Sequence, residues 1–168
     1  MKDKPIFLDS NVLITAKNDT YPFDVFPSFW EFLKESILSK KLIILDVVKN
    51  EILAGNDSLT TWLRDLNAQT MTINNQKIVD AYSQVSTYVY SLSQNYSPAV
   101  IDSWFGNMKI ADPWLIAAAL AYDGILVTNE TVAKPNAKKR LLIPNIASHF
   151  SIPCVKITQI MRELEIKL

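Results

Sequence analysis

The 168-residue sequence predicts an α/β fold of three layers, with helices on both faces of a central, mostly parallel sheet. Two observations point to this class. Continuous apolar runs of about four residues, typical of strands buried on both faces, recur along the chain. Segments with helical periodicity lie between these runs, as parallel strands require. No internal repeat or linker interrupts the pattern, so we expect one domain over residues 1–168.

The expected strands are residues 6–8 (IFL), 42–45 (LIIL), 125–128 (ILVT) and 154–157 (CVKI). In open parallel sheets, ligands bind beyond the carboxyl ends of the strands. Residues that directly follow these strands are therefore the first candidates for a functional site.

The expected helices lie between and after the strands, over residues 27–41, 46–55, 58–66, 77–92, 98–106, 111–124 and 158–168. Their starts carry capping signals. Ser28 and Glu31 have the spacing of a capping box. Asp46 is the expected cap of the second helix. Asp112 is the expected cap of the helix at 111–124, with Pro113 at its first helical position.

Composition excludes several classes of protein. The chain is 49% hydrophobic, which is typical of a globular protein, and its 17 basic and 17 acidic residues give zero net charge. This balance argues against a wholly basic surface but allows a local basic patch. Apolar runs fall short of the roughly 18 residues that a membrane span needs. Without a signal-peptide pattern, we expect a reducing, cytoplasmic setting.

The scarce residue types narrow the chemistry. Gly55, Gly106 and Gly124 each follow an expected helix, where a left-handed end favours glycine, so none is left for a phosphate-binding loop. Cys154 is the single cysteine, which excludes a disulfide within the chain and a multi-cysteine zinc site. A Ser–His–Asp triad would have to use His149, without a nucleophile-elbow sequence to support it. Catalysis would therefore depend on carboxylates.

Four acids fall at or near one edge of the expected sheet. Asp9 ends the first strand, Glu51 lies in the helix after the second, Asp112 heads the helix before the third, and Glu130 follows that strand. Taken singly, Asp9 and Asp112 could be helix caps, and Glu51 and Glu130 could be solvated. Together they would repel one another and lose hydration. Mg²⁺ or Mn²⁺, which prefer hard oxygen ligands, would relieve both problems.

The stretch FLDSNVLI (7–14), Glu51 within VVKNEI, and ADPWLIAAALAYDGILVTNE (111–130) together resemble the PIN-domain family of metal-dependent ribonucleases. The match spans residues 6–130. The following LLIPNIASHFSIPCVKI (141–157) resembles a bacterial PIN-like subgroup of poorly assigned function.

This resemblance implies a PIN-like fold and metal ligands at Asp9, Glu51 and Asp112. It places Thr128 as a hydroxyl at the site and Asn11, next to Ser10, as a supporting polar side chain. Glu130 stands where the family usually has aspartate, so it would bind a second metal position differently or through water. Many members are toxins silenced by an antitoxin protein, and a homodimer is plausible for the family.

The expected function is hydrolysis of RNA phosphodiester bonds by a Mg²⁺- or Mn²⁺-dependent endoribonuclease. A basic stretch that could grip phosphates, or could be only a solvated loop, contains Lys134, Lys138, Lys139 and Arg140. An aspartyl phosphatase is disfavoured because Asn11 stands where a second acid would be required, and phosphorylation of Asp9 would revive it. A catalytically inactive RNA- or protein-binding module on the same scaffold remains the main alternative.

Overall fold

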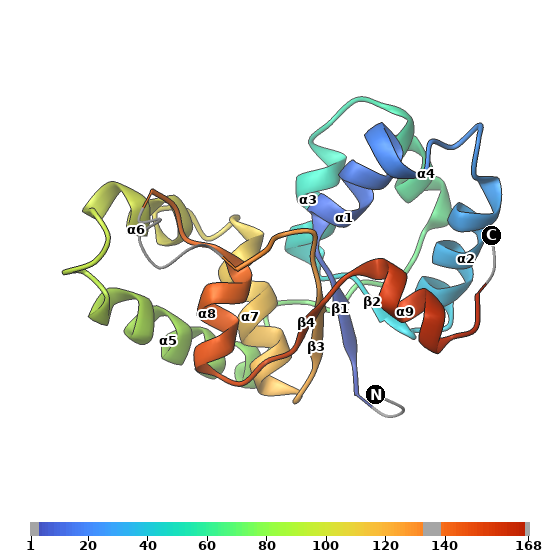
Figure 1. Cartoon of the computed structure of the whole chain (residues 1–168). Coiled ribbons are helices and arrows are strands. Elements are labelled where there is room, and N and C mark those ends of the chain that lie inside the picture. Colours follow the sequence, from blue (N-terminus) through green and yellow to red (C-terminus); the bar gives the residue numbers. More distant parts are fainter. Residues whose placement is uncertain (1–3, 133–138, 167–168) are drawn as a thin grey trace.

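The computed structural model describes residues 4–132 and 139–166, and its centre is a four-stranded sheet in the order β2-β1-β3-β4 (Figure 1). The strands are β1 (Ile6–Leu8), β2 (Leu42–Ile43), β3 (Ile125–Val127) and β4 (Cys154–Val155). All neighbouring strands are parallel, and Ile6 of β1 is in register with both Leu42 and Ile125. The predicted parallel sheet is confirmed, although three of its strands are shorter than expected.

Helices flank the sheet on both sides, with α5 to α8 on one side and α2, α4 and α9 on the other (Figure 1). The helices are α1 (Ser10–Thr15), α2 (Pro27–Leu38), α3 (Asp46–Leu53), α4 (Ser58–Leu66), α5 (Gln76–Ser91), α6 (Pro98–Phe105), α7 (Ala111–Ala121), α8 (Ile143–His149) and α9 (Ile157–Glu163), and a π-helical turn η1 (Ala16–Thr20) extends α1. The last helix ends earlier than expected, because Glu165 takes a left-handed backbone with φ of 56°. No helix in the described ranges is long and apolar enough to cross a membrane.

Helix α7 is the central helix of the fold. All its residues from Pro113 to Ala119 are buried, so every side of the helix is covered over this span. Its alanines allow close approach of neighbouring elements, and α5 packs along it. The helix that carries Asp112 is therefore fixed within the core.

Three predicted caps are wrong by one or two positions. Helix α2 begins at Pro27, whose fixed φ and missing N–H suit a first helical position, so Ser28 lies inside the helix and caps nothing. Glu31 instead binds Lys34 at 2.8 Å. Asp46 and Asp112 are the first and second residues of their helices, after Leu45 and Ile110. Pro113 is accordingly the third helical residue.

The predicted left-handed glycines are also wrong, because no glycine of the described chain has a positive φ. Asn67 and Asp123 take that conformation, with φ of 45° and 50°. Gly124 is needed for a different reason. A Cβ atom there would lie 2.6 Å from Cε2 of Phe7 and 2.9 Å from the Pro5 carbonyl oxygen. The absence of a side chain lets this turn approach the first strand.

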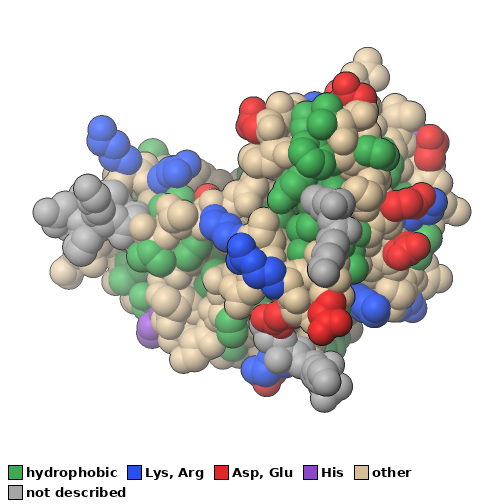
Figure 2. All heavy atoms as spheres, turned by 45° about the vertical axis from the view of Figure 1, so that its right-hand side comes forward, with side chains coloured by type: hydrophobic (Ala, Val, Ile, Leu, Met, Phe, Trp, Pro, Cys, Tyr) green, Lys and Arg blue, Asp and Glu red, His purple; other side chains and the backbone are tan. Residues whose placement is uncertain are grey.

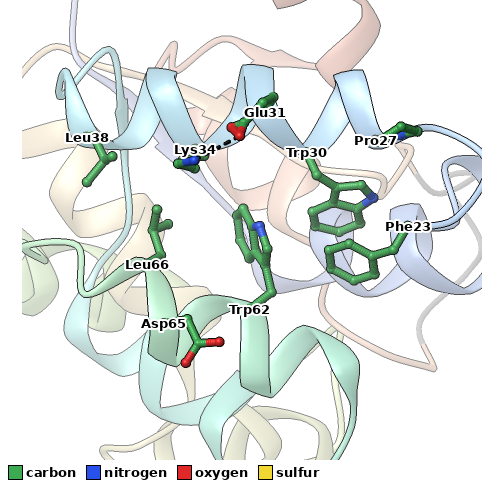
Figure 3. A pocket seen from close by; sticks show the side chains of 9 residues that line it. All are labelled: Phe23, Pro27, Trp30, Glu31, Lys34, Leu38, Trp62, Asp65 and Leu66. Carbon is green, nitrogen blue, oxygen red and sulfur yellow. Dashed lines mark hydrogen bonds and ion pairs between the residues drawn. The ribbon is translucent and has the colours of Figure 1, made fainter.

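An aromatic cluster joins α2 to α4 and borders a groove of about 390 Å³ (Figure 3). Phe23 stacks on Trp30 with ring centroids 3.8 Å apart, and Trp62 meets Trp30 edge-on at 5.0 Å. The Trp30 indole N–H donates to the Tyr21 carbonyl at 2.8 Å. Leu66 also lines the groove, whereas none of the four acids predicted for the functional site does. This cluster therefore stabilises one helical layer apart from those acids.

Candidate functional site

Asp9 lies where β1 passes directly into α1, and it is only 3% exposed. Its carboxylate caps α1 by accepting a weak 3.4 Å hydrogen bond from the Asn11 amide. It also accepts a 2.7 Å hydrogen bond from the Thr128 hydroxyl. Asp9 therefore caps α1, as one of the two interpretations of its sequence position expected, and it still lies among the candidate site residues.

Thr128 and Asn11 hold the ends of β1 and β3 together. The Thr128 hydroxyl oxygen accepts from Nδ2 of Asn11 at 3.3 Å and from the Glu130 amide at 3.1 Å. Oδ1 of Asn11 accepts from the Asn129 amide at 3.0 Å. Because donors and acceptors are paired throughout, the orientation of the buried Asp9 carboxylate is fixed.

Glu51 approaches the same edge from α3. The Ser10 hydroxyl donates a 3.0 Å hydrogen bond to Oε2 of Glu51, although Glu51 itself is exposed. Ser10 thus ties the exposed acid to the start of α1, next to Asp9.

Asp112, the second residue of α7, completes the group with Glu130. The pKa of Asp112 is raised to about 7, mainly by burial and also by the charges of Asp9, Glu130 and Glu51, and a hydrogen bond from Trp104 opposes the rise. The pKa of Asp9 is raised to about 6, mainly by burial, and its hydrogen bonds with Thr128 and Asn11 oppose the rise. The four acids therefore share one region of negative potential.

Glu130 is held at three points. Its amide donates to Thr128, and its carbonyl oxygen accepts a 3.0 Å hydrogen bond from Nζ of Lys156. The same ammonium group also donates to the Asn129 carbonyl. Oε2 of Glu130 accepts a 2.7 Å hydrogen bond from the amide of Ile143, the first residue of α8.

The donor set fits a hard divalent cation, but the carboxylates do not converge. Within residues 4–132 and 139–166, no three His, Cys, Asp or Glu side chains are arranged to hold one ion. All four candidate ligands are carboxylates, which suit Mg²⁺ or Mn²⁺ better than softer metals. The raised pKa values of Asp9 and Asp112 reflect buried negative charge that a cation would neutralise. Binding would require side chains to move toward a common point.

A family model described as a domain of unknown function (DUF4411) matches residues 6–168, which include all four acids. The chain belongs to the DUF4411 family. Among curated proteins and among solved structures, no match was found.

Two residues that position the acids of this DUF4411 chain were missed by sequence reasoning. Lys156 directly follows β4, but the expected strand ran to residue 157, so the rule that selects residues after strand ends passed over it. Trp104 offers no such signal, because its approach to Asp112 depends on how α6 packs against α7. His149 stacks on Tyr88, with ring centroids 3.5 Å apart.

The basic stretch of the DUF4411 chain is described only in part. Lys134 and Lys138 lie outside the described residues, whereas Lys139 and Arg140 are described and exposed. Figure 2 shows Lys and Arg side chains in a row across the face where the two groups of helices meet. This face offers positive charge to a polyanion, although the whole chain is neutral.

Proposed function

We propose that this DUF4411 protein is a Mg²⁺- or Mn²⁺-dependent endoribonuclease with a PIN-like fold. The observation that carries the proposal is the electrostatic coupling of Asp9, Glu51, Asp112 and Glu130 at one sheet edge. Acids so gathered lower stability unless protons or cations neutralise them. A site that tolerates this repulsion is a candidate for metal binding and catalysis.

The PIN-like assignment is supported by topology as well as by sequence pattern. The sheet is wholly parallel. Asp9 follows β1, Glu51 lies in α3, and Asp112 is the second residue of α7. A Thr-x-acid segment, Thr128 to Glu130, follows β3. These are the positions on which the resemblance to the PIN family depends.

In this proposal Asp9, Asp112 and Glu51 hold the cation. When bound, the ion would supply an activated water and offset the charge that develops on the phosphodiester. Thr128 keeps one oxygen of Asp9 oriented, and Ser10 does the same for Glu51. No covalent bond between the protein and RNA is needed.

RNA is the favoured substrate because the protein combines carboxylates suited to a metal ion with a basic face. Lys139 and Arg140 are exposed and belong to the segment that connects β3 with α8. Phosphate contacts of this kind supply affinity without base specificity.

Cleavage of single-stranded and structured RNA with Mg²⁺ or Mn²⁺ tests the proposal. Asp9→Asn, which keeps the size of the side chain but removes its charge, should abolish cleavage. Asp65→Asn, on the exposed face of α4, is the matched control and should leave activity unchanged. Equal activity of Asp9→Asn and wild type would remove Asp9 from the mechanism, and cleavage that persists in EDTA would remove the metal.

The second candidate function is a non-catalytic RNA- or protein-binding module. It is favoured by the lack of three converging metal-ligand side chains among the described residues. Titration with Mn²⁺ and Mg²⁺ separates the two candidates. A folded protein that binds RNA but neither cation would support the binding module.

A further inference from the structure

Glu130 stands where the PIN-like resemblance expects a metal-binding acid, yet its amide, its carbonyl oxygen and Oε2 of its carboxylate are engaged within the protein. Its amide donates to Thr128, its carbonyl accepts from Lys156, and one carboxylate oxygen accepts from the Ile143 amide at 2.7 Å. The side chain thus spans from the edge of β3 to the first residue of α8.

The Ile143 amide needs this partner. The first amides of a helix have no acceptor within the helix, and Leu142, which precedes α8, has no side chain that could cap it. Leu141, Leu142 and Ile143 are all at most 6% exposed, so water is a poor substitute. A carboxylate there makes a charge-assisted bond and also complements the helix dipole.

The length of the Glu130 side chain is essential to this contact. Aspartate is shorter by one C–C bond, roughly 1.5 Å. From the same backbone position its carboxylate would fall outside hydrogen-bond distance of the Ile143 amide. Glutamate in place of the family's usual aspartate is therefore explained by the reach to α8.

We propose that Glu130 is a positioning residue that anchors α8 to the carboxyl edge of the sheet, and that it is not a metal ligand. The second half rests on the proposed function, because it leaves the cation to Asp9, Glu51 and Asp112. The anchor also fixes where the chain enters α8, three residues after Arg140. It therefore sets the position of the Arg140 guanidinium group relative to the acids.

Two substitutions of Glu130 distinguish an anchor of α8 from a metal ligand, because the two roles predict opposite orders of tolerance for the variants. Glu130→Gln keeps the length and a carbonyl oxygen that can accept from Ile143, but loses the charge that a metal ligand needs. Glu130→Asp keeps the charge but loses the reach. An anchor predicts that Gln is tolerated and Asp is not, whereas a ligand predicts the reverse.

The readouts are hydrogen exchange of the Ile143 amide, Mn²⁺ affinity and RNA cleavage. We expect Glu130→Asp to speed exchange at Ile143 at least about tenfold, as loss of a buried hydrogen bond implies. We expect Glu130→Gln to retain most of the protection and to keep Mn²⁺ affinity within about threefold of wild type. Cleavage should follow the same order, with Gln above Asp.

A protected Ile143 amide in Glu130→Asp, or a Mn²⁺ affinity lost in Glu130→Gln while that amide stays protected, would overturn the inference. If a variant is too unstable for exchange measurements, the thermal unfolding midpoints of Glu130→Gln and Glu130→Asp give the same test. A lower midpoint for Glu130→Gln than for Glu130→Asp contradicts the role of Glu130 as an anchor. Failure of the proposed function is recognised separately. A wild-type protein that binds no Mn²⁺ and cleaves no RNA refutes the nuclease, while exchange at Ile143 still tests the anchor.

Discussion

The Thr128 hydroxyl donates a 2.7 Å hydrogen bond to Oδ2 of Asp9 across 119 positions of the sequence. The two residues meet because β1 and β3 are parallel neighbours with Leu8 in register with Val127, so the residues after both strands emerge side by side. This contact fixes the most buried acid of the candidate site and lowers its pKa against the effect of burial.

Replacing Thr128 with Val should therefore affect both stability and titration. Without the hydroxyl, Asp9 loses the shorter of its two hydrogen bonds, and its pKa should rise further. We expect a loss on the order of 1 to 3 kcal/mol in the free energy of unfolding near neutral pH, measured in urea. Thr128→Ser, which keeps the hydroxyl, is the control. A Val variant as stable as wild type, with an unchanged Asp9 titration by NMR, would contradict the role of this bond.

The metal-free protein should lose stability as the pH rises. The pKa values of Asp9 and Asp112 are raised from 3.8 to about 6 and about 7, so the folded state holds protons that the unfolded state releases. The stability that these two protons contribute is fully present below the ordinary carboxyl pKa of 3.8, and it is lost as the pH rises through about 6 and about 7. For Asp9 alone this corresponds to about 3 kcal/mol. Asp9→Asn and Asp112→Asn should flatten the profile, and Asp65→Asn should not.

Divalent cations should reverse that loss. A ligand that binds only the folded state stabilises it by about 2.7 kcal/mol at a hundredfold excess over its dissociation constant. We expect Mn²⁺ to raise the thermal midpoint of wild type at about pH 8 and to leave that of Asp9→Asn unchanged. A similar shift in both proteins would mean that the ion binds elsewhere.

Substitution of Gly124 by Ala should destabilise the sheet. The added Cβ would lie 2.6 Å from Cε2 of Phe7, a core side chain of the central strand that cannot move without disturbing its neighbours. Overpacking of this kind costs about 1 to 3 kcal/mol. Gly55→Ala, with nearest contacts at 3.1 and 3.2 Å, should have the smaller effect in the same unfolding assay.

Removal of the two exposed cations before α8 should weaken RNA binding uniformly across sequences. If Lys139 and Arg140 each contact a phosphate, Lys139→Ala/Arg140→Ala should reduce the slope of log K against log salt by about 1.4 for single-stranded RNA. Lys34→Ala on α2, where the ammonium group pairs with Glu31, is the control. An unchanged salt slope in the double variant would exclude these contacts.

The fold and the grouping of the acids could be predicted because each depends on local pattern. Short apolar runs separated by helices indicate a parallel sheet, and parallel strands place Asp9 and Glu130 at one edge. The exact helix starts could not be predicted as well. Both Ser28 and Asp112 are residue types that suit an N-cap. The position where the helix starts depended on Pro27 for α2 and on the packing of the helix for α7.

The sequence by itself determined the fold class and which acids lie near one edge of the sheet, because strand and helix periodicity are written in consecutive residues. Tertiary structure alone decided what each acid binds. Thr128 reaches Asp9, Trp104 reaches Asp112, and the carboxylate of Glu130 meets the amide of Ile143. These contacts join separate elements, and their lengths depend on how helices pack on the sheet, which no local pattern encodes.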